Sequence, residues 1–125
     1  MRLTSDLLYG FVGGQMEIQN PNKNYIFRGK IETIAVVGED LVVKFAWLAK
    51  GKGDLPIPAG WVKDDNLDYS TNLEICSVSN IGPSDSEIGG DDRICIMSQF
   101  IGEVIVLYPP DGSKLDPAKV EGLVI

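Results

Sequence analysis

The chain contains no histidine among its 125 residues. Histidine is the usual general base beside a nucleophilic serine or cysteine, and it is the commonest protein ligand of transition metals. Its absence excludes Ser-His and Cys-His catalytic pairs in their usual form, and it excludes every metal site that needs an imidazole. A lysine or a carboxylate remains available as a base, but no sequence motif places one beside a serine or a cysteine.

Cysteine is also scarce. Only Cys76 and Cys95 occur, and both lie in apolar, strand-like sequences. Two cysteines with this separation cannot supply the four ligands of a structural zinc site. In a reducing compartment the simplest interpretation is two small core residues. A disulfide between them requires that the two strands pair with a suitable Cα spacing, which the sequence does not define.

Long apolar runs and clusters of basic residues are missing as well. No stretch approaches the ~20 apolar residues that span a bilayer, and Ser5 and Asp6 interrupt any signal-like run near the N-terminus. The 11 Lys and Arg residues are scattered among 18 Asp and Glu, and the net charge is −7. Nucleic acids and anionic membranes both attract basic surfaces. We therefore expect a cytoplasmic protein with no membrane attachment and little affinity for nucleic acid.

The composition is that of a globular protein. Apolar residues make up 44% of the chain and charged residues 23%, which is ordinary for a folded domain. The length predicts a single domain that covers residues 1–125. Gly and Pro are spread along the sequence, and no long window without them has the 3.6-residue apolar period of a helix. Short strands joined by turns are the structure that this pattern favours.

Apolar runs between turn signals predict six to eight short strands. The runs with clear bounds are Leu7–Val12, Gln15–Gln19, Tyr25–Val37, Leu41–Leu48, Leu73–Ser79, Arg93–Met97 and Phe100–Tyr108. The Gly13-Gly14 dipeptide predicts a tight hairpin between the first two strands. The third and fourth strands form the strongest hairpin, and Gly29 marks a bulge or bend in it. The irregular stretch from Ala49 to Tyr69 is either a functional excursion or hides a short strand.

Alternation in the strong hairpin predicts which side chains share a face. Leu41, Val43, Phe45 and Trp47 form one wholly apolar face, whereas Lys44 lies on the other, so one side of the sheet is expected to be covered. On the preceding strand the same rule puts Ile31, Thr33, Ala35 and Val37 on one face, with Ile34 and Val36 opposite.

The number and spacing of the strands predict an all-β fold, a small antiparallel barrel, with a β-sandwich as the alternative. The sequence from Arg28 to Trp47, a basic-Gly-apolar strand followed by a turn and a second apolar strand, resembles SH3-like barrels in outline. The resemblance covers about twenty residues of a general pattern, and no family is assigned on it. One short helical turn is expected near the C-terminus, where Asp116 and Pro117 form a helix-start signature.

Two acidic segments and one glycine-rich segment invite a test for ion or phosphate binding. The segment from Asp64 to Asp68 begins like an EF-hand loop, but its sixth position is Tyr69 and its twelfth is Ile75. The acidic stretch Asp85–Asp92 is more typical of a solvated hairpin connection than of a metal site. The stretch Gly51–Pro56 lacks the third glycine of a dinucleotide motif and the Ser or Thr of a P-loop. We therefore predict no metal and no cofactor.

Aromatic residues provide the candidate binding site. Trp47 continues an apolar strand face, whereas Trp61 follows Pro58-Ala59-Gly60 and has no periodic face behind it. A tryptophan in such a position either clamps its loop onto the core or forms the wall of a groove. The predicted ligand-binding residues are Trp61, Trp47 and Tyr69 as the groove, with Lys50 and Lys52 on its rim.

Three functions follow from these observations, in order of preference. The first is a non-catalytic binding module that uses the aromatic groove for a peptide or a small ligand. The second is a homo-oligomer assembled through a sheet edge or the apolar tail Leu123–Ile125. The third is a hydrolase or transferase that uses carboxylates such as Asp64, Asp65, Asp91 and Asp92. It ranks last because the chain has no histidine and no positioned acid–base pair.

Overall fold

The computed structural model describes residues 3–20, 22, 24–52, 60–81, 93–98, 102–110, 117, 120 and 122–123. These residues form a short helix, α1 (Ser5–Tyr9), a single 3₁₀ turn, η1 (Leu73–Ile75), and eight strands. The strands are β1 (Gln15–Asn20), β2 (Tyr25–Val37), β3 (Asp40–Lys52), β4 (Val62–Lys63), β5 (Asp68–Asn72), β6 (Cys76–Ile81), β7 (Arg93–Ser98) and β8 (Glu103–Tyr108). The predicted all-β class is confirmed.

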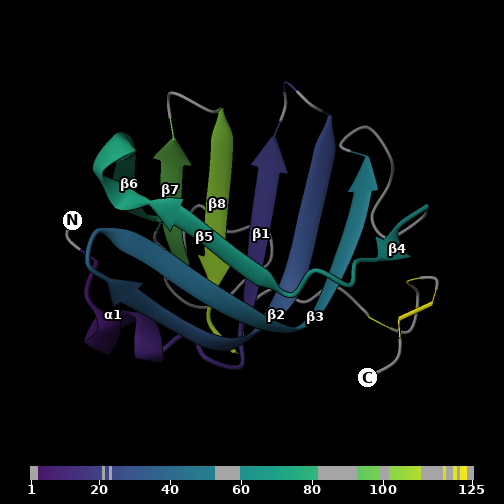
Figure 1. Cartoon of the computed structure of the whole chain (residues 1–125), viewed down its shortest axis with the longest axis horizontal. Helices are drawn as coiled ribbons and strands as arrows, with labels where there is room; N and C mark the ends of the chain where they lie inside the picture. Colours follow the sequence, from purple (N-terminus) through teal and green to yellow (C-terminus); the bar gives the residue numbers. More distant parts are fainter. Residues whose placement is uncertain are drawn as a thin grey trace.

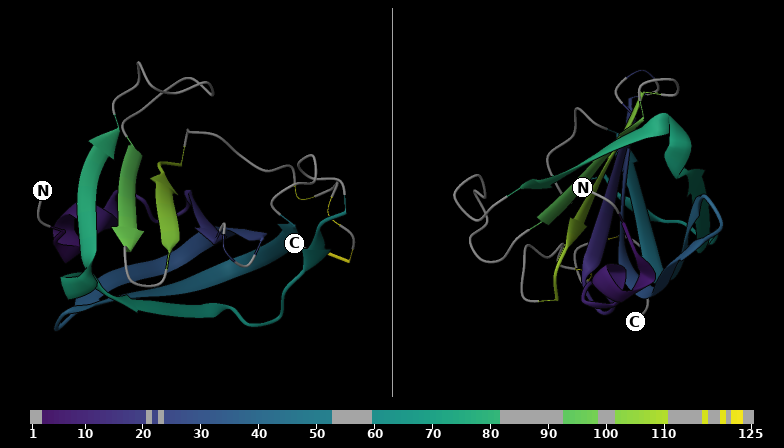
Figure 2. Two further views of the ribbon diagram at one scale, coloured as in Figure 1. Left: turned by 90° about the horizontal axis from the view of Figure 1, so that it is seen from above. Right: turned by 90° about the vertical axis from the view of Figure 1, so that its left-hand side faces the viewer.

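All eight strands belong to one antiparallel sheet, in the order β4-β3-β2-β1-β8-β7-β6, with β5 also paired to β3. Among the described residues no pairing joins β6 to β4 or β5, so the sheet is open and the predicted closed barrel is wrong. The reason lies at η1, where the Asn72 side chain accepts a hydrogen bond from the Glu74 amide at 2.9 Å and ends β5. Figure 2 shows that β6 leaves this turn in a different direction from β5.

The open sheet folds over itself into two layers. In Figure 1 the strands β7, β8 and β1 stand upright in one layer, together with one half of β2 and one half of β3, and β6 pairs with β7 at the end of this layer. The other halves of β2 and β3 cross in front of them beside β5. Both layers are thus parts of one continuous sheet, whereas a β-sandwich, the alternative prediction, consists of two separate sheets.

Two neighbouring bulges bend the long hairpin. The register of β2 and β3 shifts on either side of Ile31, so that Glu32 in β2 and Ala46 in β3 have no partner in the opposite strand. An extra residue in a strand reverses the alternation of its side chains and bends it. Both bulges lie a few residues after Gly29, the residue at which the sequence predicts a bulge or bend. Gly29 lies on the inside of the bend, where a Cβ atom would be 2.6 Å from Cδ1 of Phe45.

These bulges change the predicted faces. Leu41, Val43 and Phe45 enter the main core between the layers as expected, but Trp47 does not follow them. After the extra residue Ala46 the inward positions of β3 shift by one, and Leu48 takes the place in the main core. In β2 the extra residue likewise puts Ile31 and Ile34 in the same core, although simple alternation places them on opposite faces.

The N-terminal segment is a helix, so the predicted strand Leu7–Val12 and the Gly13-Gly14 hairpin are wrong. The hydroxyl of Thr4 caps α1 by accepting a hydrogen bond from the Leu7 amide at 3.2 Å. Leu8, on α1, is fully buried in the main core. The tertiary burial of this residue stabilises a helix too short to form alone.

A second apolar cluster lies on the opposite face of the sheet. It consists of Trp47, Ala49, Trp61 and Val120, with Ile26 and Leu123 packed against them. Ile26 and Phe27 are neighbours in β2 and belong to the two different clusters, as alternation requires. The predicted C-terminal helical turn lies outside the described residues except for Pro117, and so do the last two residues of the predicted apolar tail.

Candidate functional site

A pocket of about 170 Å³ lies inside the bend of the β2–β3 hairpin. Its apolar floor is formed by Ile18 of β1 together with Phe45 and Leu48 of β3. Ile18, Phe45 and Leu48 also belong to the main core, so the floor is rigidly held. The pocket is the space that the bent hairpin leaves between the two layers, so the fold itself creates it.

The mouth of the pocket is formed by the chain between β4 and β5, which follows β3 across its bend. The Asp64 amide donates to the Leu48 carbonyl, and the Phe45 amide donates to the Leu67 carbonyl, both at 2.8 Å. Within this segment Oδ1 of Asp64 accepts a hydrogen bond from the Asn66 amide at 2.8 Å. These bonds fix the backbone around three polar residues of the lining: Asp64 and Asn66 in the connection, and Asp68 at the start of β5.

Aromatic rings form the walls. Tyr25 and Phe27 of β2 both line the pocket, and their rings meet edge to face with centroids 4.8 Å apart. Tyr69 of β5 lines it from the other layer. The ammonium group of Lys50 lies 5.7 Å from the centroid of the Phe27 ring, within the range of a cation–π interaction.

A hydrogen bond across the pocket joins the two layers. The Tyr69 hydroxyl of β5 donates to Oε1 of Glu103, at the start of β8, at 2.8 Å. Burial, together with the hydrogen bond and the charge of Glu103, raises the pKa of Tyr69 well above its ordinary value. The phenol therefore stays protonated and serves as a donor at every physiological pH.

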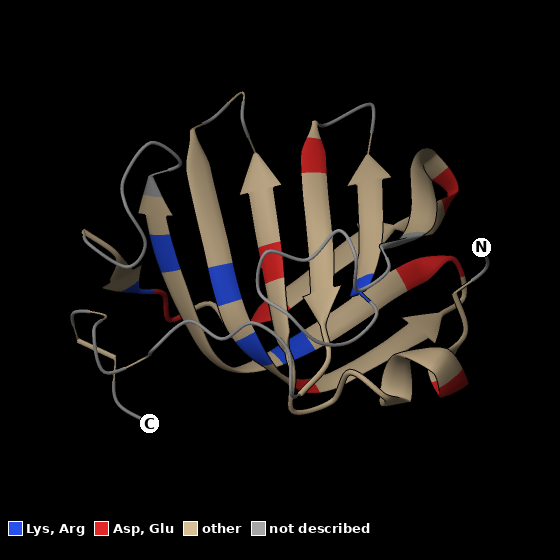
Figure 3. Cartoon of the chain, turned by 180° about the vertical axis from the view of Figure 1, so that it is seen from behind, with Lys and Arg blue, Asp and Glu red and all other residues tan. Residues whose placement is uncertain are grey.

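The pocket is electrostatically negative. Its lining includes the carboxylates of Asp64, Asp68 and Glu103 and no Lys or Arg. The ion pairs formed among the described residues lie elsewhere: Arg28 with Glu17, Lys44 with Glu32 at 3.7 Å, and Lys63 with Asp65 at 3.5 Å. Lys and Arg are otherwise spread over several strands and mixed with Asp and Glu, as Figure 3 shows for the described part of the chain.

Replacing Tyr69 with phenylalanine should lower the free energy of unfolding at pH 7 by about 1–2 kcal/mol, because the variant leaves the Glu103 carboxylate without its donor. The difference between wild type and variant should shrink above pH 10, because there the unfolded chain ionises its tyrosine while the folded chain keeps the proton. Urea unfolding of both proteins at pH 7, 9 and 10.5 measures this. Equal stability at pH 7 would contradict the assigned hydrogen bond.

The two predicted tryptophans do not line this pocket. Trp47 is 5% exposed and Trp61 1% exposed, and both lie in the second apolar cluster on the opposite face of the sheet. Trp61 packs against Gly51, where a Cβ atom would collide with the indole ring. The sequence leaves two alternatives for Trp61, a clamp on the core or the exposed wall of a groove. The ring is buried and therefore acts as a clamp, in a space that exists because residue 51 is a glycine.

The other predicted site residues have different positions. Tyr69 lines the pocket, and Lys50, which pairs with Phe27 in the β2–β3 register, has its ammonium group 5.7 Å from the Phe27 ring centroid. Lys52 belongs to β3, but its side chain lies outside the described part of the structure. Prediction missed the aromatic pair Tyr25 and Phe27, although their i, i+2 spacing puts them on one strand face. Tyr69 and Glu103 are 34 residues apart in the chain, and no pattern in the sequence predicts that they meet.

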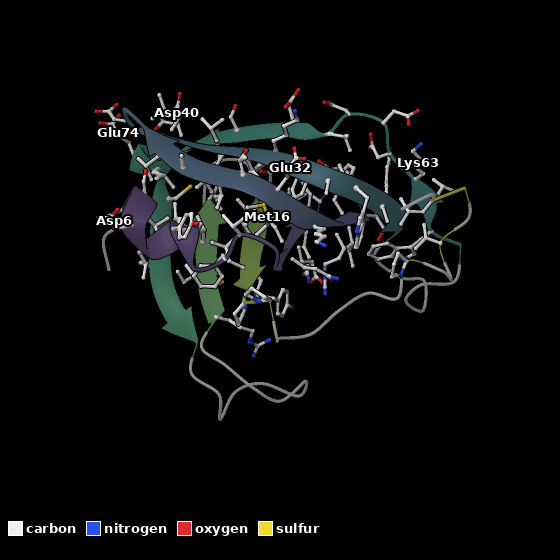
Figure 4. All side chains as sticks on the ribbon, turned by 90° about the horizontal axis from the view of Figure 1, so that it is seen from below. Asp6, Met16, Glu32, Asp40, Lys63 and Glu74 are labelled. Carbon is white, nitrogen blue, oxygen red and sulfur yellow. The ribbon has the colours of Figure 1, made fainter. Side chains whose placement is uncertain are left out.

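A larger pocket of about 340 Å³ lies at the other end of the hairpin. Its lining includes Glu39, Glu74 and Cys76 and contains no aromatic ring. The hydrogen bond with Glu74 and the Glu74 charge raise the pKa of Glu39. Figure 4 places Glu74 and Asp40 at one end of the molecule, and the two pockets share no lining residue. This larger pocket has no aromatic wall beside its carboxylates, so it offers a ligand fewer contacts than the aromatic pocket does.

The cysteines and acidic segments can be placed in part. Cys76 and Cys95 are both free. The β6–β7 register pairs Cys76 with Ser98 and Cys95 with Ser79, so the two thiols do not face each other. Within the described ranges no group of three or more Cys, Asp or Glu side chains could hold a metal ion. The acidic stretch Asp85–Asp92 lies outside those ranges.

Comparisons of the chain with protein-family models, with curated proteins and with solved structures found no match. Among the described residues, the only α-helix is far too short to cross a bilayer. The chain is an all-β protein with one open, folded-over sheet, and the aromatic pocket is its candidate functional site.

Proposed function

We propose that this protein is a non-catalytic binding module whose ligand site is the aromatic pocket inside the β2–β3 bend. The observation that carries the proposal is the combination of a rigid apolar floor, three aromatic rings and a few converging polar groups in one cavity. Ligand pockets in proteins have this composition. A binding role without catalysis also agrees with the absence of histidine from the sequence.

The size of the pocket limits the ligand. Sites for drug-sized molecules usually measure ~300–1,000 Å³, whereas this one measures about 170 Å³. A cavity of ~150 Å³ accommodates benzene. The ligand is therefore a small molecule or a single side chain of a bound peptide.

The proposal can be tested with a fragment library screened by NMR against the ¹⁵N-labelled protein. Fragments that bind should shift the amide signals of Phe27 and Tyr69, and they should leave those of Val36 and Leu73, beside the larger pocket, unchanged. The variant Asn66→Tyr, which puts a bulky ring at the exposed mouth, should abolish these shifts. The adjacent Asp65→Tyr variant is the matched control, because Asp65 is exposed and does not line the pocket. A library with no fragment acting on Phe27 and Tyr69 would rule the proposal out.

A second candidate function is self-association through the edge of β6. Within the described strands β6 pairs only with β7, at the end of the sheet. Its sequence CSVSNI contains no charged residue and no proline, which are the usual protections of an edge strand. Light scattering at two concentrations tests this candidate, and the variant Ser79→Lys should prevent any dimer seen. A monomer at both concentrations would eliminate it.

A further inference from the structure

We propose that the group recognised by the aromatic pocket is a primary alkylammonium, the chemistry of a small aliphatic amine or of a lysine side chain. This inference rests on the proposed binding function and adds the class of ligand to it. Charge, ring geometry, hydrogen-bond acceptors and size each support it.

Charge is the first argument. Three carboxylates line a pocket that contains no Lys or Arg, in a protein of net charge −7. None of the three forms an ion pair with a described basic residue, whereas Glu17, Glu32 and Asp65 each do. An anionic ligand would be repelled. A neutral apolar ligand would strip water from the carboxylates without replacing their hydrogen bonds.

The aromatic walls favour the same group. Rings of Tyr and Phe attract cations to their faces through their quadrupoles, and the attraction strengthens where water is excluded. The chain already supplies one example beside the pocket, where the Lys50 ammonium lies 5.7 Å from the Phe27 ring centroid. Lys50 itself is exposed and does not belong to the lining of the pocket, so its ammonium group does not take the place of a ligand there.

Hydrogen-bond acceptors distinguish a primary ammonium from a quaternary one. Oε1 of Glu103 accepts from Tyr69, and Oδ1 of Asp64 accepts from the Asn66 amide. In the described part of the chain these bonds engage one oxygen of each carboxylate. A primary ammonium has three donors to offer these carboxylates, and a tetramethylated nitrogen has none. The pocket volume suits a butyl chain lying on the floor formed by Ile18, Phe45 and Leu48.

The test is an NMR titration at low ionic strength with four probes of similar size: n-butylammonium, n-butanol, butyrate and tetramethylammonium. We expect n-butylammonium to shift the amide signals of Phe27 and Tyr69 with a dissociation constant on the order of 1 mM, as befits about five heavy atoms. The other three should bind at least about tenfold more weakly, and the affinity for n-butylammonium should fall as salt is added.

Variants identify the carboxylates responsible. Asp64→Asn keeps an acceptor for the Asn66 amide but removes the charge, and it should weaken n-butylammonium binding about three- to tenfold. Glu103→Gln keeps an acceptor for Tyr69 and should act in the same way. Asp65→Asn removes an equal charge one residue from Asp64 but outside the lining, and it should change the affinity less than about twofold.

The outcomes separate the two proposals. Equal binding of n-butanol and n-butylammonium, or tighter binding of butyrate, would overturn the alkylammonium inference and leave the ligand pocket intact. No binding by these probes or by any library fragment would overturn both. A further arm compares n-butylamine with the capped tripeptide Gly-Lys-Gly. Tighter binding of the peptide supports a lysine side chain of a partner, and equal binding supports a free amine.

Discussion

Replacing Trp61 with alanine is expected to lower the free energy of unfolding by about 3–5 kcal/mol, the usual cost of truncating a buried tryptophan. Trp61 is the largest of the fully buried side chains, at 1% exposed. It packs in the second apolar cluster with Trp47 and Val120, and it ties the segment before β4 to the outer face of β3. Removal of the indole opens a cavity that neighbours held by two strands cannot fill.

The variant Trp61→Phe separates packing from hydrogen bonding. The indole Nε1 is buried and has no acceptor among the described residues, so its removal relieves an unsatisfied donor while most of the ring volume remains. We expect Trp61→Phe to cost less than about 1.5 kcal/mol. Urea unfolding followed by circular dichroism measures both variants. A Trp61→Ala protein as stable as the wild type would show that the ring is not a clamp, and ligand affinity at the aromatic pocket should not change in either variant.

Replacing Arg28 with methionine should also cost about 3–5 kcal/mol, because the Glu17 carboxylate is then left buried without its counter-ion. Arg28 is 6% exposed and Glu17 5% exposed, and they face each other across the β1–β2 register. Methionine also loses two other contacts of the guanidinium. Nη1 of Arg28 donates a hydrogen bond to Oε1 of Gln15 at 3.3 Å, and Cζ lies 4.5 Å from the Tyr108 ring centroid. Thermal and urea unfolding of the variant test this.

A surface pair provides the matched control. Lys44 and Glu32 are 3.7 Å apart with side chains 58% and 51% exposed, so Lys44→Met should cost less than about 1 kcal/mol. The double variant Glu17→Met/Arg28→Met should lose less stability than the sum of the losses in the two single variants, because no lone charge remains buried. Equal costs for Arg28→Met and Lys44→Met would contradict the buried ion pair.

Alternation predicted most of the strands because it is a local property. The hairpin of β2 and β3, strand β1 and the strands β6 to β8 were all visible as apolar runs between turn residues. The two bulges were not, because a single extra residue such as Glu32 or Ala46 leaves the composition of a strand unchanged. Those two residues decide that Trp47 faces away from Phe45 and that the sheet folds into two layers.

Helix α1 shows a different limit. The run Leu7–Val12 fits a short strand as well as one helical turn, and periodicity cannot separate the two at this length. The cap at Thr4 was the available signal. Thr hydroxyls also stabilise turns outside helices, so Thr4 alone does not distinguish a helix from a strand.

The candidate site was predicted in part. The sequence predicts Tyr69 in an aromatic groove with Lys50 on its rim, and Tyr69 does line the pocket, but it also puts Trp61 in that groove because no periodic face explains this residue. Trp61 packs against Gly51, which has no side chain, so this contact produces no apolar pattern in the sequence. Glu103 reaches the pocket only because β8 and β5 lie in facing layers, which is a tertiary fact.

The most direct test of the account is to locate a bound alkylammonium by intermolecular nuclear Overhauser effects. With n-butylammonium in excess over the isotope-labelled protein, its methylene protons should show effects to the ring protons of Phe27 and Tyr69 and to the methyl groups of Leu48. The indole protons of Trp61 should show none. Effects confined to Trp61, to the larger pocket beside Glu74, or to no residue at all would contradict the assignment of the aromatic pocket as the binding site.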